Sequence, residues 1–283
     1  MLTEWHFWVA SLRTDEILMV LGVLLLVDAP RYAYSVIVMA IWDCLKFPFT
    51  GTLPGPGVDG YDYWPTISVV IAGYNEADTI AETMRSVYER HPDVQLIVVD
   101  DGSTDGMADA AAEFAAGRPG ITVLKRADRG GKSSALNMGL QRATGEVLIT
   151  IDADSKLSDH SLMELVQPLK DSSVAAVSAT VLSWNPFASF CAWLQAYEYR
   201  QTIFISRMAR GRAGVLGIVS GAFGAFRTDV LKKLGGWDVG PGEDGDLVLR
   251  IRRAGYQIGV APYAHCFTNV PTRWRQLFRQ RCR

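Results

Sequence analysis

The sequence predicts an α/β protein with a mixed, mostly parallel sheet flanked by helices. Three observations support this prediction. Short β-branched runs such as Thr66–Ala72 and Gln95–Asp100 have the length and composition of buried strands. Segments with the length and composition of helices separate these runs. Acidic residues follow several of the runs, at the sheet edge where α/β proteins bind ligands.

Seven elements are expected to alternate along residues 66–151. The strands are predicted at Thr66–Ala72, Gln95–Asp100, Ile121–Lys125 and Glu146–Ile151. The helices are predicted at Asp78–Glu89, Met107–Ala116 and Lys132–Ala143. Strands and helices that alternate at this spacing form right-handed βαβ units, so the strands are expected to be parallel.

The first 48 residues are predicted to associate with a membrane. Ile17–Val27 is an unbroken apolar run, and Tyr32–Trp42 is a second, mostly apolar one. Neither reaches the roughly 20 residues that span hydrocarbon. Together they would form one long helix kinked at Pro30, or two short re-entrant or interfacial helices; a helix buried in the main domain is the alternative. Residues 49–65, rich in Gly, Pro and aromatic side chains, are a predicted linker to a main domain at 66–283.

Composition indicates the cellular compartment of the protein and argues against one class of function. The 28 Lys and Arg residues nearly balance 30 Asp and Glu residues, which argues against a nucleic-acid-binding protein. The four cysteines, Cys44, Cys191, Cys266 and Cys282, are scattered without the spacing of a metal site. Unpaired thiols are typical of a reducing compartment, so the main domain is expected in the cytoplasm.

A long aromatic and amphipathic segment occupies Pro186–Met208. It is predicted to be a helix, either packed in the core or lying at the membrane interface. Basic side chains on or after the segment would suit anionic lipid headgroups: Arg200, Arg207, Arg210 and Arg212.

Two acidic motifs follow predicted buried strands. Asp100–Asp105 (DDGSTD) has carboxylates that can accept hydrogen bonds from a uracil ring and a ribose, and Gly102 permits a tight turn. Helix capping explains one acidic residue there but not three in six. Asp152 and Asp154, two residues apart after the fourth strand, can share one hard divalent cation that neutralises a diphosphate.

Three further motifs carry candidate functional groups. Gly130–Ser134 (GGKSS) resembles the end of a phosphate-binding loop, but Arg126 occupies the place of that loop's first glycine. Lys132 is therefore either a phosphate contact at a helix N-terminus or a solvated lysine. Asp244, in Gly-Glu-Asp, is either a base for an acceptor hydroxyl or part of a surface loop before a helix from Asp246. Residues 273–283 contain five arginines.

The order of these motifs resembles that of the inverting glycosyltransferases of family 2. The sequence contains AGYNE at 72–76, then DDGSTD, GGKSSALN, DAD, VSGA at 219–222, GED and finally QRCR. The set is most similar to the processive branch of cellulose, chitin, hyaluronan and poly-β-1,6-N-acetylglucosamine synthases. The resemblance covers residues 66–283. It implies a GT-A fold, a donor such as UDP-N-acetylglucosamine or UDP-glucose, a Mg²⁺ or Mn²⁺ ion, and transfer to a growing β-linked polysaccharide.

The resemblance also implies which residues bind the nucleotide. By position, Tyr74, Glu76 and Asp101 would hold the uridine. Asp100 would share that role, and Lys132 would lie close to the nucleotide.

The remaining motifs match the reacting end of the family's site. Asp152 and Asp154 match its DxD motif, with Asp154 as the direct metal ligand, and Asp244 matches its catalytic base. Gln280 and Arg283 match the first and fourth residues of its QxxRW motif, which lies over the donor and acceptor.

The sequence ends at Arg283, where the family motif continues with a tryptophan. Members of the family continue into further membrane helices, so we expect a fragment of an inner-membrane enzyme whose catalytic domain faces the cytoplasm. A non-processive transferase that adds one sugar to a lipid carrier or glycan is the alternative within the enzyme class. A nucleotide-binding regulatory module without turnover is a second alternative. A nucleoside triphosphatase is a third, weakened by Arg126.

Overall fold

The computed structural model divides the chain into two compact units, Met1–Pro54 and Gly55–Arg283. It describes residues 15, 22, 30 and 32–41 of the first unit, and residues 61–238, 240 and 242–281 of the second. Residues 32–41 are helical, whereas most of the apolar run Ile17–Val27 and most of the predicted linker lie outside the described residues. No helix within the described ranges is long and apolar enough to cross a membrane. The membrane segment therefore stays a prediction.

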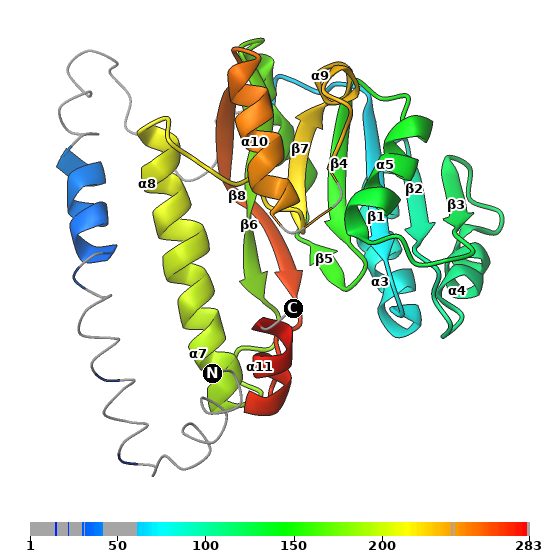
Figure 1. The fold of residues 1–283 in the computed structure, drawn as a ribbon, viewed down its shortest axis with the longest axis horizontal. Coiled ribbons are helices and arrows are strands. Elements are labelled where there is room, and N and C mark those ends of the chain that lie inside the picture. The colour runs from blue at the N-terminus through cyan, green and yellow to red at the C-terminus, as the bar shows by residue number, and fades with distance from the viewer. Residues whose placement is uncertain are drawn as a thin grey trace. The chain divides into compact units, whose positions relative to one another are not determined.

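The described residues of the second unit form an eight-stranded sheet in the order β3-β2-β1-β4-β7-β6-β8-β5 (Figure 1). The strands are β1 (Ile67–Gly73), β2 (Gln95–Asp100), β3 (Ile121–Lys125), β4 (Val147–Asp152), β5 (Ser155–Leu157), β6 (Val174–Ser183), β7 (Phe223–Arg227) and β8 (Gln257–Thr268). β1 to β4 are mutually parallel, as are β6 and β8, whereas β7 and β5 pair antiparallel with their neighbours. The predicted mixed, mostly parallel sheet is confirmed.

Helices cover both faces of this sheet (Figure 1). One face carries α3 (Ala77–Tyr88), α4 (Met107–Ala115) and α6 (Ser161–Val166), and the other carries α5 (Lys132–Arg142), α9 (Thr228–Lys233) and α10 (Glu243–Arg253). Strand side chains alternate between the two faces, so Val69 and Ile71 enter the first core while Val70 and Ala72 enter the second. The 3-10 turn η1 (Gln167–Lys170) follows α6, and α11 (Trp274–Arg281) lies near the end of the chain.

The seven elements predicted between residues 66 and 151 are all present, with ends shifted by one residue at most. The long amphipathic segment is also helical, but it begins at Phe190, where the Ser189 hydroxyl accepts a hydrogen bond of 3.1 Å from the Ala192 amide. It continues as α7 (Phe190–Tyr199), the π-helical turn η2 (Arg200–Ile205) and α8 (Ser206–Arg212). No strand after Ile151 is predicted from the sequence, and the described residues contain four more.

The cysteines that the structure describes are consistent with the expectation of unpaired thiols. Cys191 and Cys266 are buried and free. Cys44 and Cys282 lie outside the described residues.

The strand order places the predicted motifs at one edge of the sheet. β1 lies between β2 and β4. The helix that follows β1, α3, packs on one face of the sheet, and the helix that precedes β4, α5, packs on the other, which creates the switch point where α/β sheets bind ligands. In the register of these strands Gly73 lies beside Asp100, and Ala72 lies beside Asp152. The residues that follow all three strands are therefore neighbours.

Candidate active site

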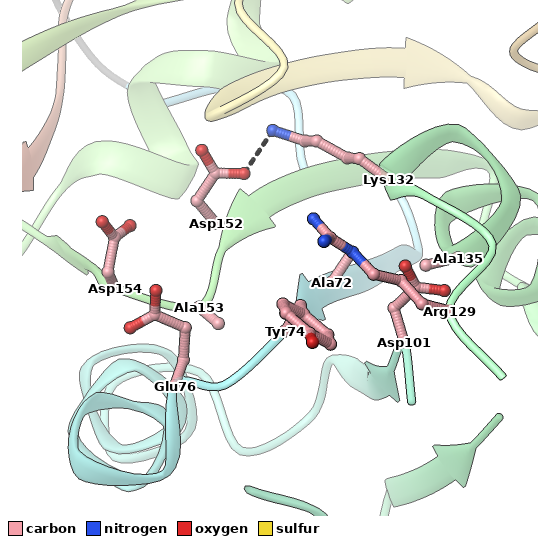
Figure 2. A pocket seen from close by; sticks show the side chains of 11 residues that line it. Ala72, Tyr74, Glu76, Asp101, Arg129, Lys132, Ala135, Asp152, Ala153 and Asp154 are labelled. Carbon is pink, nitrogen blue, oxygen red and sulfur yellow. Dashed lines mark hydrogen bonds and ion pairs between the residues drawn. The ribbon is translucent and has the colours of Figure 1, made fainter. Parts of the chain in front are cut away.

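A pocket of about 220 Å³ opens at this switch point (Figure 2). Its lining comes from the ends of β1 and β4, the loops that follow β1, β2 and β4, the loop before α5, and the first turn of α5. The lining residues are Ala72, Gly73, Tyr74, Glu76, Asp101, Arg129, Lys132, Ala135, Asp152, Ala153 and Asp154. Six of the ten residues predicted for the site are therefore brought together in one pocket.

One side of the pocket carries an aromatic ring and a buried carboxylate. The Arg129 guanidinium lies 4.0 Å from the centre of the Tyr74 ring, a cation–π contact that Figure 2 shows. The Asp101 carboxylate is buried and accepts hydrogen bonds from the amides of Gly130 and Gly131, at 2.9 and 2.8 Å. Arg126 also lies 3.3 Å from it. The amides that a phosphate-binding loop would offer to a ligand thus bind Asp101, which shapes this wall of the pocket.

Asp100 lies outside the pocket lining, unlike its neighbour Asp101. One of its carboxylate oxygens accepts a 2.8 Å hydrogen bond from the Ser103 amide. The other is buried and has no hydrogen-bond partner among the described residues. The motif also fixes the adjacent loop, because the Thr104 amide donates to Asn75 Oδ1 at 2.9 Å and Asn75 itself has a left-handed φ of 57°. One oxygen of Asp100 thus binds the loop, and its shared role in holding the uridine stays a prediction.

The opposite side of the pocket carries three carboxylates: Glu76, Asp152 and Asp154 (Figure 2). Burial raises the pKa of Asp154, and the charge of Asp152 raises it further. Burial and the charge of Asp154 likewise raise the pKa of Glu76. The Thr268 hydroxyl donates to Asp154 at 3.3 Å and partly offsets this effect. Excess negative charge of this kind is what a divalent cation would relieve.

The donor set fits a cation held jointly by the protein and a ligand. Among the described residues no group of three or more His, Cys, Asp or Glu side chains forms a complete metal site. Mg²⁺ and Mn²⁺ commonly take one or two carboxylates from the protein and the remaining oxygens from phosphates and water. Asp154 and Asp152 match that arrangement.

Lys132 supplies positive charge in the same pocket. It lies in the first turn of α5, and its ammonium forms an ion pair with Asp152 (Figure 2). Partial burial opposes the charged form, but the carboxylates of Asp152, Asp244 and Glu243 outweigh that effect and raise the pKa of Lys132. Lys132 is therefore a cation that is paired with Asp152 in the pocket, and not a free, solvated lysine.

Asp244 lies in the first turn of α10, which begins at Glu243 and not at Asp246 as the sequence suggests. The Gly221 amide donates to Asp244 Oδ2 at 3.1 Å. In the same turn the Ala222 carbonyl accepts a 3.2 Å hydrogen bond from the Asp152 amide. Burial raises the pKa of Asp244, while the Lys132 charge and the Gly221 hydrogen bond lower it in part. One turn of the chain thus connects Asp244 with the carboxylate side of the pocket.

The C-terminal motif is only partly described. Gln280 is exposed on α11 and does not line the pocket, and Arg283 lies outside the described residues. Arg281 forms an ion pair of 2.6 Å with Glu198, which joins α11 to α7. Arg207 differs from its sequence-based interpretation as a headgroup ligand, because its guanidinium turns inward to the Ala179 carbonyl at 3.1 Å.

Sequence reasoning missed three contributors to the site. Arg129 stacks on Tyr74, but no spacing rule marks it in the loop before GGKSS. Gly221 belongs to the VSGA motif. The place of this motif in the sequence helps to indicate the family, but it does not reveal that Gly221 binds Asp244. Thr268 reaches Asp154 from the end of β8, 114 residues further along the chain, which no local pattern can reveal.

Comparison with known proteins identifies the family. Residues 65–283 match the family model described as "Glycosyltransferase like family 2". The chain belongs to this glycosyltransferase family. It is 30% identical over 220 residues to a poly-β-1,6-N-acetyl-D-glucosamine synthase of Staphylococcus epidermidis, covering 77% of this chain and 53% of that protein. The enzyme of the same name from Staphylococcus aureus strain MW2 is 28% identical over the same shares. The chain thus spans about half the length of the curated relatives it matches.

Solved glycosyltransferases share the fold. A mannosyltransferase from Pyrobaculum calidifontis, solved with GDP-mannose and Mn²⁺, superposes with a TM-score of 0.66 at 27% identity, over 91% of this chain and 71% of that one. GalNAc-T7, solved with UDP, GalNAc and Mn²⁺, gives a TM-score of 0.57 at 18% identity, over 76% of this chain and 47% of that one, and supports the fold alone. The predicted GT-A glycosyltransferase fold is confirmed.

Proposed function

We propose that this glycosyltransferase is an inverting enzyme that transfers a sugar from a UDP-sugar to a growing β-linked polysaccharide, with a divalent metal and with Asp244 as general base. The observation that carries the proposal is the turn at residues 220–222. It binds Asp244 through the Gly221 amide and the strand end at Asp152 through the Ala222 carbonyl. A base and a diphosphate site are thereby held at a fixed separation.

Asp244 has the properties of a base for an acceptor hydroxyl. Because burial raises its pKa, Asp244 is a stronger base than an ordinary aspartate. In a single displacement the acceptor oxygen bonds to the anomeric carbon as its proton passes to Asp244. The bond from that carbon to the diphosphate breaks, and its electron pair leaves with the nucleoside diphosphate. One displacement inverts the centre, so an α-linked donor gives a β-linkage.

Lys132 and the acidic pair serve the leaving group. Lys132 places a positive charge beside Asp152, where a diphosphate would develop negative charge. Asp154, assisted by Asp152, would hold Mg²⁺ or Mn²⁺, and the bound ion supplies further charge neutralisation to the diphosphate. Burial and neighbouring carboxylates raise the pKa values of Asp154 and Glu76, and this excess of negative charge supports the assignment.

The opposite side of the pocket suits the nucleoside. Tyr74, whose ring contacts the Arg129 guanidinium, offers a flat surface for a base, and Asp101 offers carboxylate oxygens on the same side. Glu76 would hold the uridine from the carboxylate side of the pocket. The relatives named as poly-β-1,6-N-acetylglucosamine synthases support UDP-N-acetylglucosamine as donor, with UDP-glucose next. The mannosyltransferase solved with GDP-mannose makes a GDP-linked sugar the donor to test against them.

Membrane association is part of the proposal. Phe187, Phe190 and Trp193 expose between 44% and 90% of their side chains near or on α7, which suits a lipid interface. Together with the predicted segment 1–48, they support a catalytic domain on the cytoplasmic side of the inner membrane. We propose the boundaries 1–48, 49–65 and 66–283 for membrane segment, linker and catalytic domain.

Processivity depends on the final motif. We propose that Gln280 and Arg283 act over the donor and acceptor end. Gln280 is exposed on α11 and does not line the donor pocket. The alternative is a non-processive transferase that adds one sugar to a lipid carrier or glycan. Product length from a radiolabelled donor distinguishes the two: a ladder of long products indicates the polysaccharide synthase, and a single addition indicates the alternative.

A donor panel tests the proposed chemistry. Release of nucleoside diphosphate is measured with UDP-N-acetylglucosamine, UDP-glucose and GDP-mannose, each with Mn²⁺ and with EDTA. We expect turnover of one UDP-sugar that EDTA abolishes. Turnover of GDP-mannose alone would contradict the donor assignment, and turnover undiminished by EDTA would contradict the metal.

A further inference from the structure

A second groove, of about 410 Å³, lies outside the donor pocket. It is formed by α3 and the residues that follow it, by β5, and by the ends of β6 and β8. Its lining includes Trp184, Phe267 and a set of charged side chains, and none of its described lining residues belongs to the donor pocket. The proposed chemistry gives this groove no role.

The charges that line the groove compensate one another. Lys156 lies 2.6 Å from Glu82, Arg90 donates to Asp159 at 2.6 Å, and Arg85 lies 3.4 Å from Glu89. These pairs leave the described lining with no net charge. A nucleotide or a phosphate needs an excess of positive charge, whereas a neutral ligand with many hydroxyl groups can use both members of each pair. The groove therefore favours a neutral polar ligand.

Trp184 gives the groove an aromatic surface that is both exposed and fixed. Its side chain is 55% exposed. Its backbone amide donates to the Thr268 carbonyl at 2.9 Å, and its ring meets the Phe267 ring edge-on at 5.7 Å. The Lys156 ammonium lies 4.7 Å from the ring centre. An indole held this way offers apolar area at little cost in side-chain entropy, because its contacts already restrict its rotamer.

The groove is connected to the reacting end of the donor pocket through two strands. β5 begins at Ser155, directly after Asp154. Lys156 lies two residues after Asp154, about 7 Å further along the strand. Thr268 bonds Asp154 with its hydroxyl and accepts from the Trp184 amide with its carbonyl. A chain-like ligand whose end lies at Asp154 is thus within reach of Trp184.

We propose that this groove is a binding subsite for a pyranose unit of the glycan. The apolar face of the sugar ring packs on the Trp184 indole, and its hydroxyl groups bond with the paired side chains of Lys156 and Glu82 and of Arg90 and Asp159. The subsite rests on the proposed glycan acceptor. The proposal specifies where a sugar unit of that glycan binds when it lies away from the reacting end.

Direct binding to the full chain tests the subsite without donor. Calorimetric titrations use two probes, a β-1,6-linked N-acetylglucosamine pentasaccharide and a β-1,4-linked glucose pentasaccharide. Loss of the indole by Trp184→Ala should raise the Kd of at least one probe about tenfold, and Trp184→Phe should raise it less. Trp64→Ala is the matched control, because Trp64 is 41% exposed but packs at a tilt against His91, with ring centres 5.3 Å apart, outside the groove. It should leave the Kd unchanged, and UDP should bind all variants equally.

Several outcomes would overturn the subsite. These are equal Kd values for wild type and Trp184→Ala, no binding of either probe to wild type, or an equal loss in Trp64→Ala. If Trp184→Ala unfolds, as its Tm would reveal, Trp184→Phe and Lys156→Met take its place under the same criteria. Probe binding that depends on Trp184, in a chain that turns over no nucleotide sugar, would sustain the subsite and refute the proposed function. Turnover of a nucleotide sugar by a chain whose probe binding does not depend on Trp184 would refute the subsite and sustain the proposed function.

Discussion

The turn that holds Asp244 can be perturbed by a single methyl group. Gly221 has no side chain, and a Cβ at this position would lie 2.8 Å from Asp244 Oδ2 and 3.0 Å from Oδ1. Gly221 is not among the described glycines with a positive φ, so alanine is compatible with its backbone. The clash that Gly221→Ala introduces is therefore with the Asp244 carboxylate, and the backbone conformation of residue 221 does not oppose the substitution.

The size of the effect follows from these distances. Ordinary contact with a Cβ begins near 3.4 Å, so the carboxylate must move by about 0.6 Å or the turn must retreat from it. Either response breaks the 3.1 Å bond from the Gly221 amide. A hydrogen bond to a charged group contributes about 1.5–3 kcal/mol, so kcat should fall about 10- to 100-fold.

The pH dependence of kcat provides a second readout. The Gly221 amide favours the ionised carboxylate, so losing the bond raises the pKa of Asp244 beyond its already raised value. The base is active only above its pKa, so the acidic limb of the pH–rate profile should move to higher pH. Steady-state rates of nucleoside diphosphate release, measured as a function of pH, would record the shift.

Gly217→Ala is the matched control for this experiment. A Cβ at Gly217, in the same loop, would meet nothing within 4 Å. We expect it to keep the wild-type rate and profile. If Gly221→Ala retains the wild-type kcat and acidic limb while folding normally, the reasoning that assigns Asp244 as the base is refuted.

Three other predictions concern the charges and the surface. Lys132→Met should lower kcat about tenfold or more, and should move the acidic limb to higher pH because the Lys132 charge lowers the pKa of Asp244; an unchanged profile would contradict the coupling. Asp154→Asn should raise the Mn²⁺ concentration for half-maximal rate about 100-fold or more, and an unchanged Mn²⁺ titration would remove Asp154 from the metal site. The double variant Phe190→Ala/Trp193→Ala should lower the fraction of protein that floats with phosphatidylglycerol vesicles about tenfold, and equal flotation would exclude α7 from the interface.

The local chemistry of the site could be predicted because it follows strands whose apolar pattern is strong. β1, β2 and β4 are almost wholly buried. Parallel pairing then brings their carboxyl ends together, so Tyr74, Asp101 and Asp152 become neighbours for topological reasons. That inference needs no side-chain detail.

The rest depended on contacts that local patterns do not encode. β7 pairs antiparallel with β4 across more than 70 residues, and this pairing brings Ala222 to Asp152. The hydrogen bond from Gly221 joins the same turn to Asp244 on α10. Asp100 is buried and accepts a hydrogen bond from Ser103, whereas its neighbour Asp101 lines the pocket. Neither hydrophobic period nor motif spacing predicts which of two adjacent carboxylates lines the pocket.

The most direct measurement of the central claim is sugar transfer and UDP binding by Asp244→Asn. Asparagine keeps the shape of the side chain and can still accept from the Gly221 amide, but it cannot take a proton at neutral pH. We expect transfer to fall about 1,000-fold or more, consistent with loss of a general base together with its charge, while UDP binds with a Kd close to that of wild type. Transfer at an ordinary rate by Asp244→Asn would contradict the assignment of the base and with it the proposed mechanism.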